Sequence, residues 1–437
     1  MTLTFLDIIP IILVFVFYFL GMPIVYSLFG STFFYFLFID TTSQPWLILQ
    51  KVMNSTQSFS MLAIPFFIMS GSVMNFGGIS DKLMDFCECV TGHMRGGLAQ
   101  VNVLLSMLMG GCSGSANADC AMQSKMLVPE MEKRGYSKAF SAAITAASSA
   151  ATPVIPPGVN LIVFTLIAQA SLGRMFAAGY IPGFLMSISM MITVAIIARR
   201  RKYPKTREKF PPVKEVVKQA FVSFWGLFFP FGIILGMRFG MFTPSEGGAF
   251  AVLYCFIIGK FVYKKLSFRE HLIPIILDTI AGTSSVVLIM VSANVFGNYM
   301  SWVNLPKIVA KAVLDLTTNK YIFLMLCNLI LLIMGMFLEG GAALMIITPL
   351  LLPVALQLGI NVYHFGIVAL VNIMIGGITP PFGSMMFTTC GITGCKITDF
   401  LKEVWPFILC LFVVLMLLTF IPVLSTILPD LFFGAGA

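Results

Sequence analysis

Apolar runs alternate with short polar segments along nearly the whole chain, from about Ile8 to Leu428. Hydrophobic residues make up 58% of the 437 residues and charged residues only 10%, more apolar surface than a globular core could bury. The solvent around most of the chain must therefore be lipid. Because a spanning helix needs about 20 apolar residues, the length predicts roughly ten to fourteen membrane segments. The pattern predicts an all-α, polytopic integral membrane protein.

Several apolar runs end at clusters of Gly, Pro or small polar residues instead of at charged loops. Val101–Met109 leads into segment 110–119, which reads GGCSGSANAD and is followed by a second apolar arm. Segments 151–160 and 376–384 interrupt their runs with proline pairs, which stop a helix and free upstream carbonyl groups. Non-helical backbone at membrane depth is tolerated only where protein buries it or where it lines a wet cavity. We therefore expect re-entrant helical hairpins and broken helices near the bilayer midplane.

The chain matches itself without gaps at a shift of 224 residues. The coincidences are mostly Gly and Pro, the residues that fix backbone geometry: Gly111 with Gly335, Pro129 with Pro353, Gly135 with Gly359, Pro156-Pro157 with Pro380-Pro381, and Pro182 with Pro406. We expect two homologous halves, 1–200 and 212–437, joined by a basic cytoplasmic linker at 201–211.

The basic residues predict that the two halves face opposite sides of the membrane. Loops 199–209 and 260–269 are rich in Lys and Arg, whereas their counterparts at 425–437 and 35–45 have none. A third pair of loops shows the same contrast, and a fourth, which contains Lys82 and Lys307, does not. Since basic loops stay in the cytoplasm, equivalent loops fall on opposite sides. Inverted repeats with interrupted helices are typical of secondary transporters, although channels share them.

Segment 110–119 carries the densest polar chemistry inside an apolar run. Its hydroxyl, carbonyl and amide oxygens suit a small cation, and helix N-termini beside it suit an anion. Its counterpart, 335–342, is less polar but adds Glu339, which either lines the cavity or caps the following helix. Helix packing through small residues is the alternative, but it leaves Asn117 and Asp119, both costly in lipid, without a role.

Together with the proline breaks, the two hairpin tips predict two pseudo-symmetric cation cages. The expected cation ligands are Ser113, Gly114, Ser115, Asn117, Thr152, Val154, Gly335, Gly340, Gly341, Gly376, Gly377 and Thr379. The residues expected to face the substrate are Ser115, Asn117, Asp119, Pro157, Asn160, Glu339, Pro381 and Ser384.

Other polar residues give weaker signals. Thr243-Pro244-Ser245-Glu246 predicts a capping box with Pro at the first helical position. Asp278 is either a relay carboxylate or an interfacial residue, and we expect Arg174 to anchor a loop. No Walker, HExxH or GxSxG motif and no paired His occurs in the sequence, which argues against ATP hydrolysis and against an enzyme. The net charge of +9 comes from the membrane-flanking loops and does not indicate nucleic acid.

Six stretches resemble the large membrane subunit of tripartite ATP-independent periplasmic (TRAP) transporters, and the resemblance covers nearly the whole chain. They are LAIPFFIMSG (62–71), SGSANADC (113–120), PVIPPG (153–158), FTPSEGGA (242–249), ITPLLLP (347–353) and GGITPPFG (376–383). The resemblance implies an ion-transporter superfamily-like fold with two re-entrant hairpins, and elevator-type, sodium-driven uptake across the bacterial inner membrane. The implied substrate is an organic acid, a C4-dicarboxylate or an acidic sugar such as sialic acid.

The resemblance also implies two partners, a small four-helix membrane subunit and a periplasmic substrate-binding protein. We expect the small subunit to be a separate chain, because no such segment precedes this one. By the same analogy, the hairpins at about 96–130 and 320–355 move with the substrate, while the long helices at the start of each half form the scaffold. No cofactor is implied besides sodium. A stand-alone anion symporter or exchanger of the same superfamily and an ion channel remain as alternatives.

Overall fold

The computed structural model describes residues 5–40, 46–57 and 59–434, and within these ranges every regular element is a helix. The first part of the chain forms α1 (Phe5–Phe19), α2 (Ile24–Phe34), α3 (Trp46–Thr56), α4 (Ala63–Phe76), α5 (Ile79–Thr91), α6 (Gly97–Ser113), α7 (Ala116–Lys133), α8 (Lys138–Ser149), α9 (Val159–Ala168) and α10 (Leu172–Arg200). The second part forms α11 (Val213–Val222), α12 (Phe224–Arg238), α13 (Pro244–Ile257), α14 (Phe268–Trp302), α15 (Leu305–Leu316), α16 (Lys320–Phe337), α17 (Gly340–Gln357), α18 (Val362–Gly376), α19 (Ser384–Thr393), α20 (Ile397–Phe420) and α21 (Val423–Phe433). Short helical turns η1 (Tyr35–Ile39), η2 (Phe59–Leu62) and η3 (Ile258–Val262) complete the set. The all-α prediction is confirmed.

Fewer helices than expected are long enough to cross a bilayer by themselves. Within the described ranges six helices have the length and apolar character of a span, or eight if two bent pairs each count as one. The bent pairs are α4 with α5, at 67°, and α11 with α12, at 59°. The prediction of ten to fourteen segments counted apolar runs, but Gly, Pro and polar breaks divide several of these runs into helices of 10–17 residues. The first run, for example, is broken at Gly21 and Pro23 into α1 and α2.

Helix boundaries in the two parts coincide under the same shift of 224 residues. Helices α6 and α7 coincide with α16 and α17 at three of their four ends and lie within one residue at the fourth, the start of α6. The start of α8 falls on the start of α18, and α9 falls within one residue of α19. The prolines of both breaks, Pro156-Pro157 and Pro380-Pro381, are joined by cis peptide bonds. The two parts thus share one sequence of helix, break and helix.

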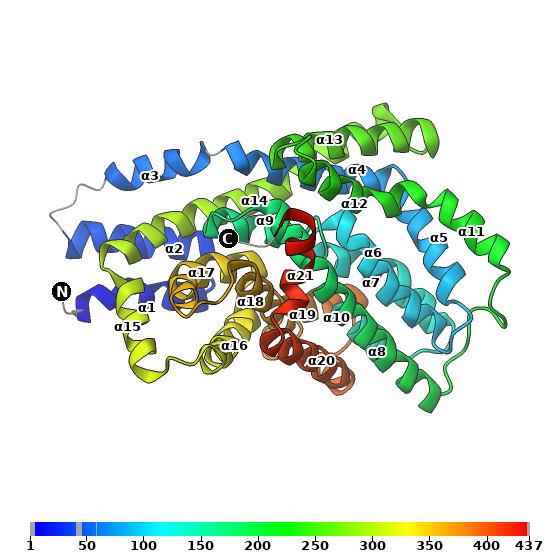
Figure 1. Ribbon diagram of the computed structural model, residues 1–437. Helices are drawn as coiled ribbons and strands as arrows, with labels where there is room; N and C mark the ends of the chain where they lie inside the picture. Colours follow the sequence, from blue (N-terminus) through cyan, green and yellow to red (C-terminus); the bar gives the residue numbers. More distant parts are fainter. Residues whose placement is uncertain (1–4, 41–45, 58, 435–437) are drawn as a thin grey trace.

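The two helical pairs α6/α7 and α16/α17 lie on either side of the centre of the molecule (Figure 1). The centre is occupied by α10 and α18 to α21, while α3, α4, α13 and α14 run along one edge (Figure 1). Helix α4 packs on both α13 and α14, and α14 also packs on α17. Residues from both parts of the chain therefore meet at the centre.

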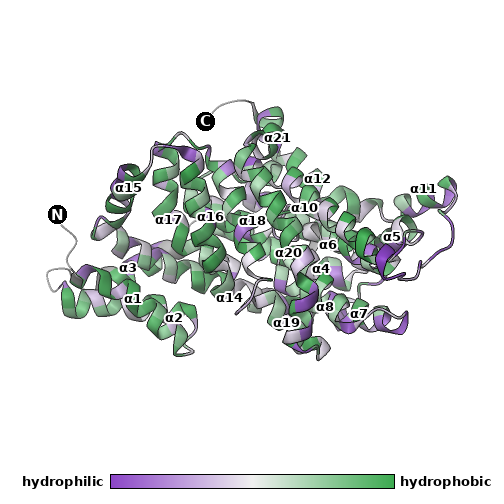
Figure 2. Cartoon of the chain, turned by 90° about the horizontal axis from the view of Figure 1, so that it is seen from below, coloured by the Kyte–Doolittle hydropathy of each residue, from purple (hydrophilic) through white to green (hydrophobic). Residues whose placement is uncertain are grey.

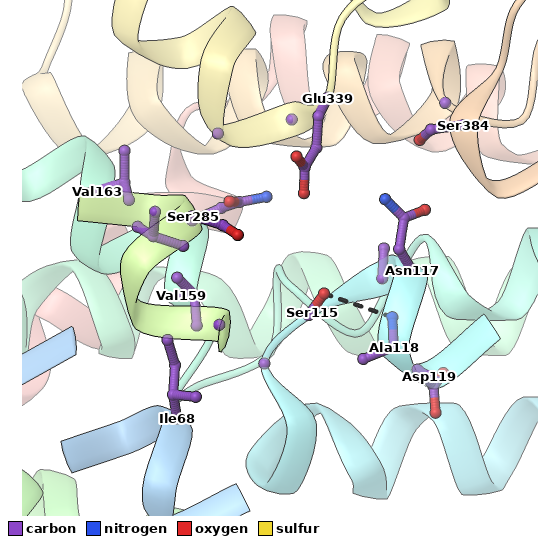
Figure 3. Close-up of a pocket in the computed structure, with 18 of the residues that line it drawn as sticks. Ile68, Ser115, Asn117, Ala118, Asp119, Val159, Val163, Ser285, Glu339 and Ser384 are labelled. Atoms are coloured by element: carbon purple, nitrogen blue, oxygen red, sulfur yellow. Dashed lines mark hydrogen bonds between the residues drawn. The ribbon is translucent and has the colours of Figure 1, made fainter. Parts of the chain in front are cut away.

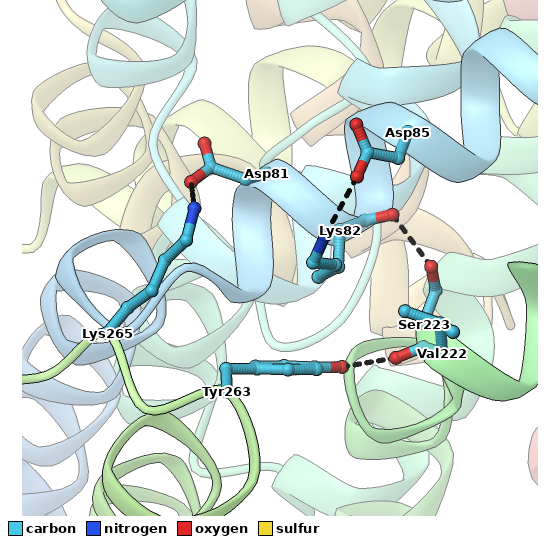
Figure 4. Close-up of polar contacts among 7 residues, drawn as sticks. All are labelled: Asp81, Lys82, Asp85, Val222, Ser223, Tyr263 and Lys265. Carbon is cyan, nitrogen blue, oxygen red and sulfur yellow. Dashed lines mark hydrogen bonds and ion pairs between the residues drawn. The ribbon is translucent and has the colours of Figure 1, made fainter.

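Hydrophobic residues cover most of the helices, and hydrophilic residues gather around α5, α11 and the loop that leads into α11 (Figure 2). Both basic loops contact α5. Lys265 pairs with Asp81 at 2.7 Å near one end of this helix (Figure 4), and the amide of Arg207 donates to the carbonyl of Gly92 just beyond the other end. The hydrogen bond with Asp81 raises the pKa of Lys265, so the ammonium group of Lys265 stays charged at neutral pH.

Candidate functional site

The first tip separates α6 from α7 by two residues. Gly114 has φ of +58°, a left-handed conformation that favours glycine, and this turns the chain out of α6. Ser115 then caps α7, its hydroxyl accepting a long hydrogen bond from the amide of Ala118 at 3.5 Å. The expected break within 110–119 is present and lies at residues 114 and 115.

The second tip separates α16 from α17 at Leu338 and Glu339. Glu339 occupies the N-cap position of α17, but its side chain makes no capping hydrogen bond. Instead it is exposed and points into the same space as Asn117 (Figure 3). Of the two roles that the sequence left open for Glu339, the geometry matches the cavity-lining one.

Both tips border a cavity of about 470 Å³ between the hairpins and helices α4 and α14. This volume is within the range of pockets that bind small organic molecules. The N-terminal ends of α7, α9, α17 and α19 all reach it through residues 116–119, 159–160, 340–341 and 384–385. Asn160, two residues after the first break, lies beside Gly340 and Gly341 of the second tip. The cavity is therefore built jointly by the two parts of the chain.

The helix ends supply the positive side of the cavity. Helices α9, α17 and α19 have no side chain that caps their first amides, although the amides of Val159 and Met385 donate to the carbonyl groups of Gly114 and Gly377. The N-terminal end of each helix carries the positive end of the helix dipole. Asn117 of α7 also lines the cavity, and its Oδ1 atom is buried and has no hydrogen-bond partner. Among the described lining residues Asp119, Asp278 and Glu339 are acidic, and none is Lys, Arg or His. Any anion bound here must be held by backbone amides, neutral side chains or a bound cation.

The carboxylate of Asp119 does not face the cavity, which corrects the expectation that it faces the substrate. The residue borders the cavity, but its carboxylate is fully buried and points away from the cavity (Figure 3). It accepts hydrogen bonds from Ser106 at 2.9 Å, Gln123 at 2.8 Å and Thr152 at 2.9 Å. The carboxylate therefore joins α6, α7 and the first break, and holds the tip from behind.

The expected cation ligands divide into two groups. Gly114, Ser115, Asn117, Gly340, Gly341 and Gly377 line the cavity. The other group lies in the packing behind the cavity and contains Thr152, Val154, Gly335, Gly376 and Thr379. The hydroxyl of Thr152 donates to Asp119, and the hydroxyl of Thr379 donates to the carbonyl of Ile375. The carbonyl of Val154 lies against Gly179 of α10, and Gly335 lies against Gly376. Ser113 ends α6, and its side chain lies outside the described part of the structure.

The expected substrate residues also divide. Ser115, Asn117, Asn160, Glu339 and Ser384 line the cavity. Pro157 and Pro381 do not: Pro157 is buried and Pro381 is exposed elsewhere. The proline pairs lie in the breaks between α8 and α9 and between α18 and α19, and the residues that follow each pair reach the cavity in their place.

The sequence reasoning missed the opposite wall, formed by α4 and α14. Ser72 and Asn75 of α4 and Asp278 and Ser285 of α14 line the cavity there, and Ser72 donates a hydrogen bond to Asp278 at 3.3 Å. The signal was present, since an ionisable residue inside an apolar run is a functional candidate by default. The predicted capping box is confirmed, since Thr243 and Glu246 form it at α13. Arg174, which we expected to anchor a loop, instead donates to the carbonyl of Phe433 at the end of helix α21, at 3.0 Å.

The comparisons with known proteins agree with one another. The family model of the DctM component of the tripartite ATP-independent periplasmic transporters matches residues 11–424. The sialic acid TRAP transporter large permease of Vibrio cholerae is 34% identical over 96% of this chain and 97% of its own. The C4-dicarboxylate large permease of Pseudomonas aeruginosa is 33% identical, over 87% and 88%, and the 2,3-diketo-L-gulonate large permease of Escherichia coli is 33% identical, over 85% and 87%.

A solved structure shares the fold. The YdaH transporter of Alcanivorax borkumensis superposes with a TM-score of 0.62 at 16% identity, over 88% of this chain and 89% of its own. The relatives are transport proteins, and the helices described above have the apolar character of membrane spans. The chain therefore belongs to the DctM family, the large permease component of TRAP transporters, and is a multi-pass protein of the bacterial inner membrane and not an enzyme.

Proposed function

We propose that this permease takes up an organic acid by coupling its entry to sodium. The observation that carries the proposal is the convergence of four helix N-termini on a cavity lined by acidic side chains, with no basic side chain among its described lining residues. An organic anion entering such a site adds negative charge in a low-dielectric interior, which is costly unless a cation enters with it. The hydroxyl, carbonyl and amide oxygens at the two tips suit a hard cation of this kind.

The proposed cation positions are the tip residues that line the cavity, namely Gly114 and Ser115 in one part and Gly340 and Gly341 in the other. The residues behind them, among them Thr152 and Thr379, hold the broken backbone so that its carbonyl groups remain available. Asn117, Asn160 and Ser384 are the proposed substrate contacts. Asp119 takes a positioning role, because its carboxylate is already satisfied by three partners.

The proposed movement is that of an elevator. The two parts of the chain, 1–200 and 212–437 with the linker 201–211 between them, act as inverted repeats of one fold. The hairpins α6/α7 and α16/α17 carry the tips across the membrane, while α4 and α14 form a fixed wall opposite them. The coincident helix boundaries support the repeat, and the contrast in basic residues between equivalent loops supports the inversion.

The proposed assembly contains two further proteins, as the family name and the names of the relatives suggest. A small membrane subunit would cover part of the apolar surface, and a periplasmic binding protein would deliver the acid. The test is uptake of a labelled acid into proteoliposomes that contain all three proteins, driven by an inward sodium gradient.

We expect uptake that saturates, stops when potassium replaces sodium, and requires the binding protein. Sodium-dependent uptake that is equally fast without the binding protein would favour a stand-alone symporter. Current that passes without saturation or coupling would favour a channel. Uptake that is independent of sodium would contradict the proposed coupling directly.

A further inference from the structure

The wall formed by Ser72, Asn75, Asp278 and Ser285, called here the acceptor wall, is not explained by sodium coupling alone. We propose, on the basis of the function proposed above, that the cavity selects a polyhydroxylated monocarboxylate, a sugar acid, over a simple dicarboxylate. The cavity has two kinds of surface, helix N-termini that favour one carboxylate and an array of oxygen acceptors that favours hydroxyl donors.

Two carboxylates remain open to a ligand. Asp278 is exposed and accepts one hydrogen bond, from Ser72 at 3.3 Å, so it has lone pairs left for further donors. Glu339 is exposed on the other side of the cavity, and its side chain makes no capping bond. Asp119 differs from both, since its oxygens are buried and already hydrogen-bonded. The open acceptors therefore lie on both sides of the cavity.

A dicarboxylate fits this charge pattern poorly. One of its carboxylates finds the positive N-terminal ends of α9, α17 and α19, which no side chain caps. The other must then lie in a cavity that already holds Asp278 and Glu339 and has no basic residue among its described lining. Like charges at short range in a low-dielectric site repel strongly. An acid that carries a single charge, with hydroxyl groups along its length, keeps the favourable contact and avoids the repulsion.

The neutral polar groups on the acceptor wall favour a ligand with several hydroxyl groups over a ligand with a single ammonium group. Ser72, Asn75 and Ser285 each carry a side chain that both donates and accepts hydrogen bonds, and they come from two helices, α4 and α14. One ammonium group would leave most of them unpaired, whereas a chain of hydroxyls can pair with several. A site that bonds several hydroxyl groups favours a ligand that carries them over an analogue that lacks them.

The test is equilibrium binding to the purified full-length chain in lipid nanodiscs, in sodium and in potassium buffer. The probes are radiolabelled gluconate, glucuronate and N-acetylneuraminate on one side and succinate and fumarate on the other. We expect at least one sugar acid to bind about 10-fold or more tightly than either dicarboxylate, since a hydrogen bond to a charged acceptor is worth about that factor.

Asp278→Asn should weaken binding of the sugar acid by about 10-fold and should leave succinate unchanged or bound more tightly, because one repelling charge is gone. Ser72→Ala, a second variant at the same wall, should weaken the sugar acid in the same direction. Asp315→Asn, on the exposed face of α15, should change neither.

Equal affinity for succinate and the sugar acids would overturn the inference, as would an Asp278→Asn variant that loses both classes equally. Neither result would count against the proposed function, sodium-coupled uptake. Binding that is the same in sodium and potassium would count instead against the proposed function, while a preserved preference for sugar acids would still support the inference. Failure of the wild-type chain to bind any of the five acids would overturn the inference.

Discussion

The amide group of Asn160 lies directly beside Gly340, although the two residues belong to different parts of the chain. A methyl group at Gly340 would come within 2.9 Å of Nδ2 of Asn160 and 2.2 Å of Cε of Met374. Asn160 follows the first break, and Gly340 begins α17 at the second tip. The position of a proposed substrate contact in one part is therefore set by the backbone of the other.

Gly340→Ala should reduce substrate affinity more than it reduces stability. Overpacking a tight site costs about 1–3 kcal/mol, and the easiest relief is to move the Asn160 amide and the end of Met374. Displacement of the amide weakens substrate binding, and each 1.4 kcal/mol of binding free energy lost lowers the affinity roughly 10-fold. Uptake kinetics and thermal unfolding of the purified variant measure the two effects.

Gly391→Ala is the matched control, because no atom lies within 4 Å of a methyl group added there in α19. It should leave affinity unchanged and should not lower stability, because Ala favours a helix more than Gly does. If Gly340→Ala transports with wild-type affinity, the close contact with Asn160 does not position the substrate.

Ser115→Ala should raise the sodium concentration needed for half-maximal uptake. Ser115 caps α7 only weakly, at 3.5 Å, and its hydroxyl also lines the cavity, so the loss of an oxygen ligand should outweigh the loss of the cap. Ser137→Ala removes a shorter cap, 3.2 Å from the amide of Phe140 at α8, from a residue outside the cavity lining. This control should cost about 0.5–2 kcal/mol of stability with no change in sodium dependence. An identical sodium response of the two variants would refute the role of Ser115.

Asp119→Ala should destabilise the protein, in contrast to Ser115→Ala. The change leaves Ser106, Gln123 and Thr152 without their shared acceptor, and each buried group left unsatisfied costs about 1–3 kcal/mol. The thermal midpoint of the purified chain should fall clearly, whereas Asp315→Ala on exposed α15 should leave it unchanged. A variant with wild-type stability and lost sodium coupling would show instead that Asp119 acts on the ion directly.

The sequence was sufficient to locate the breaks because their causes are local. Gly114 and Ser115 turn and cap the chain through their own backbone and side chain, and the proline pairs keep the backbone of the two breaks from being helical. The same local chemistry explains why helix ends coincide in the two parts. The predicted number of spans differs from the six to eight candidate spans among the described residues, because an apolar run does not reveal whether it forms one helix or two.

The direction of side chains at the site depended on contacts that no local pattern encodes. Asp119 faces away from the cavity because Ser106, Gln123 and Thr152, from different elements, surround it. The acceptor wall exists because Ser72 and Asp278 meet although they lie 206 residues apart in the sequence. Such pairs become visible only when the packing of α4 on α14 is known.

The linker between the two parts is fastened to the second part by an ion pair, and this gives a further prediction. Arg201, the residue after α10, places Nη1 2.8 Å and 2.9 Å from the two carboxylate oxygens of Glu403 in α20. Its guanidinium also lies 5.8 Å from the ring centre of Phe140 in α8. The hydrogen bond to Glu403 raises the pKa of Arg201, which is already high, so the guanidinium stays charged at any usable pH. The salt dependence of the free energy of unfolding therefore tests the pair.

Glu403→Gln should lower the free energy of unfolding by about 0.5–1 kcal/mol at low salt, because Arg201 is partly exposed and its pair is screened by solvent. The difference from wild type should shrink as salt is added, since ions screen exposed charges over about 10 Å at 0.1 M. Asp399→Asn on the same helix is the control. Its partner Lys402 lies only three residues away in α20, so breaking that pair releases no contact between elements. If Glu403→Gln and Asp399→Asn lose the same small stability with the same salt response, Arg201 does not fasten the linker, and the two parts are held together by their apolar packing alone.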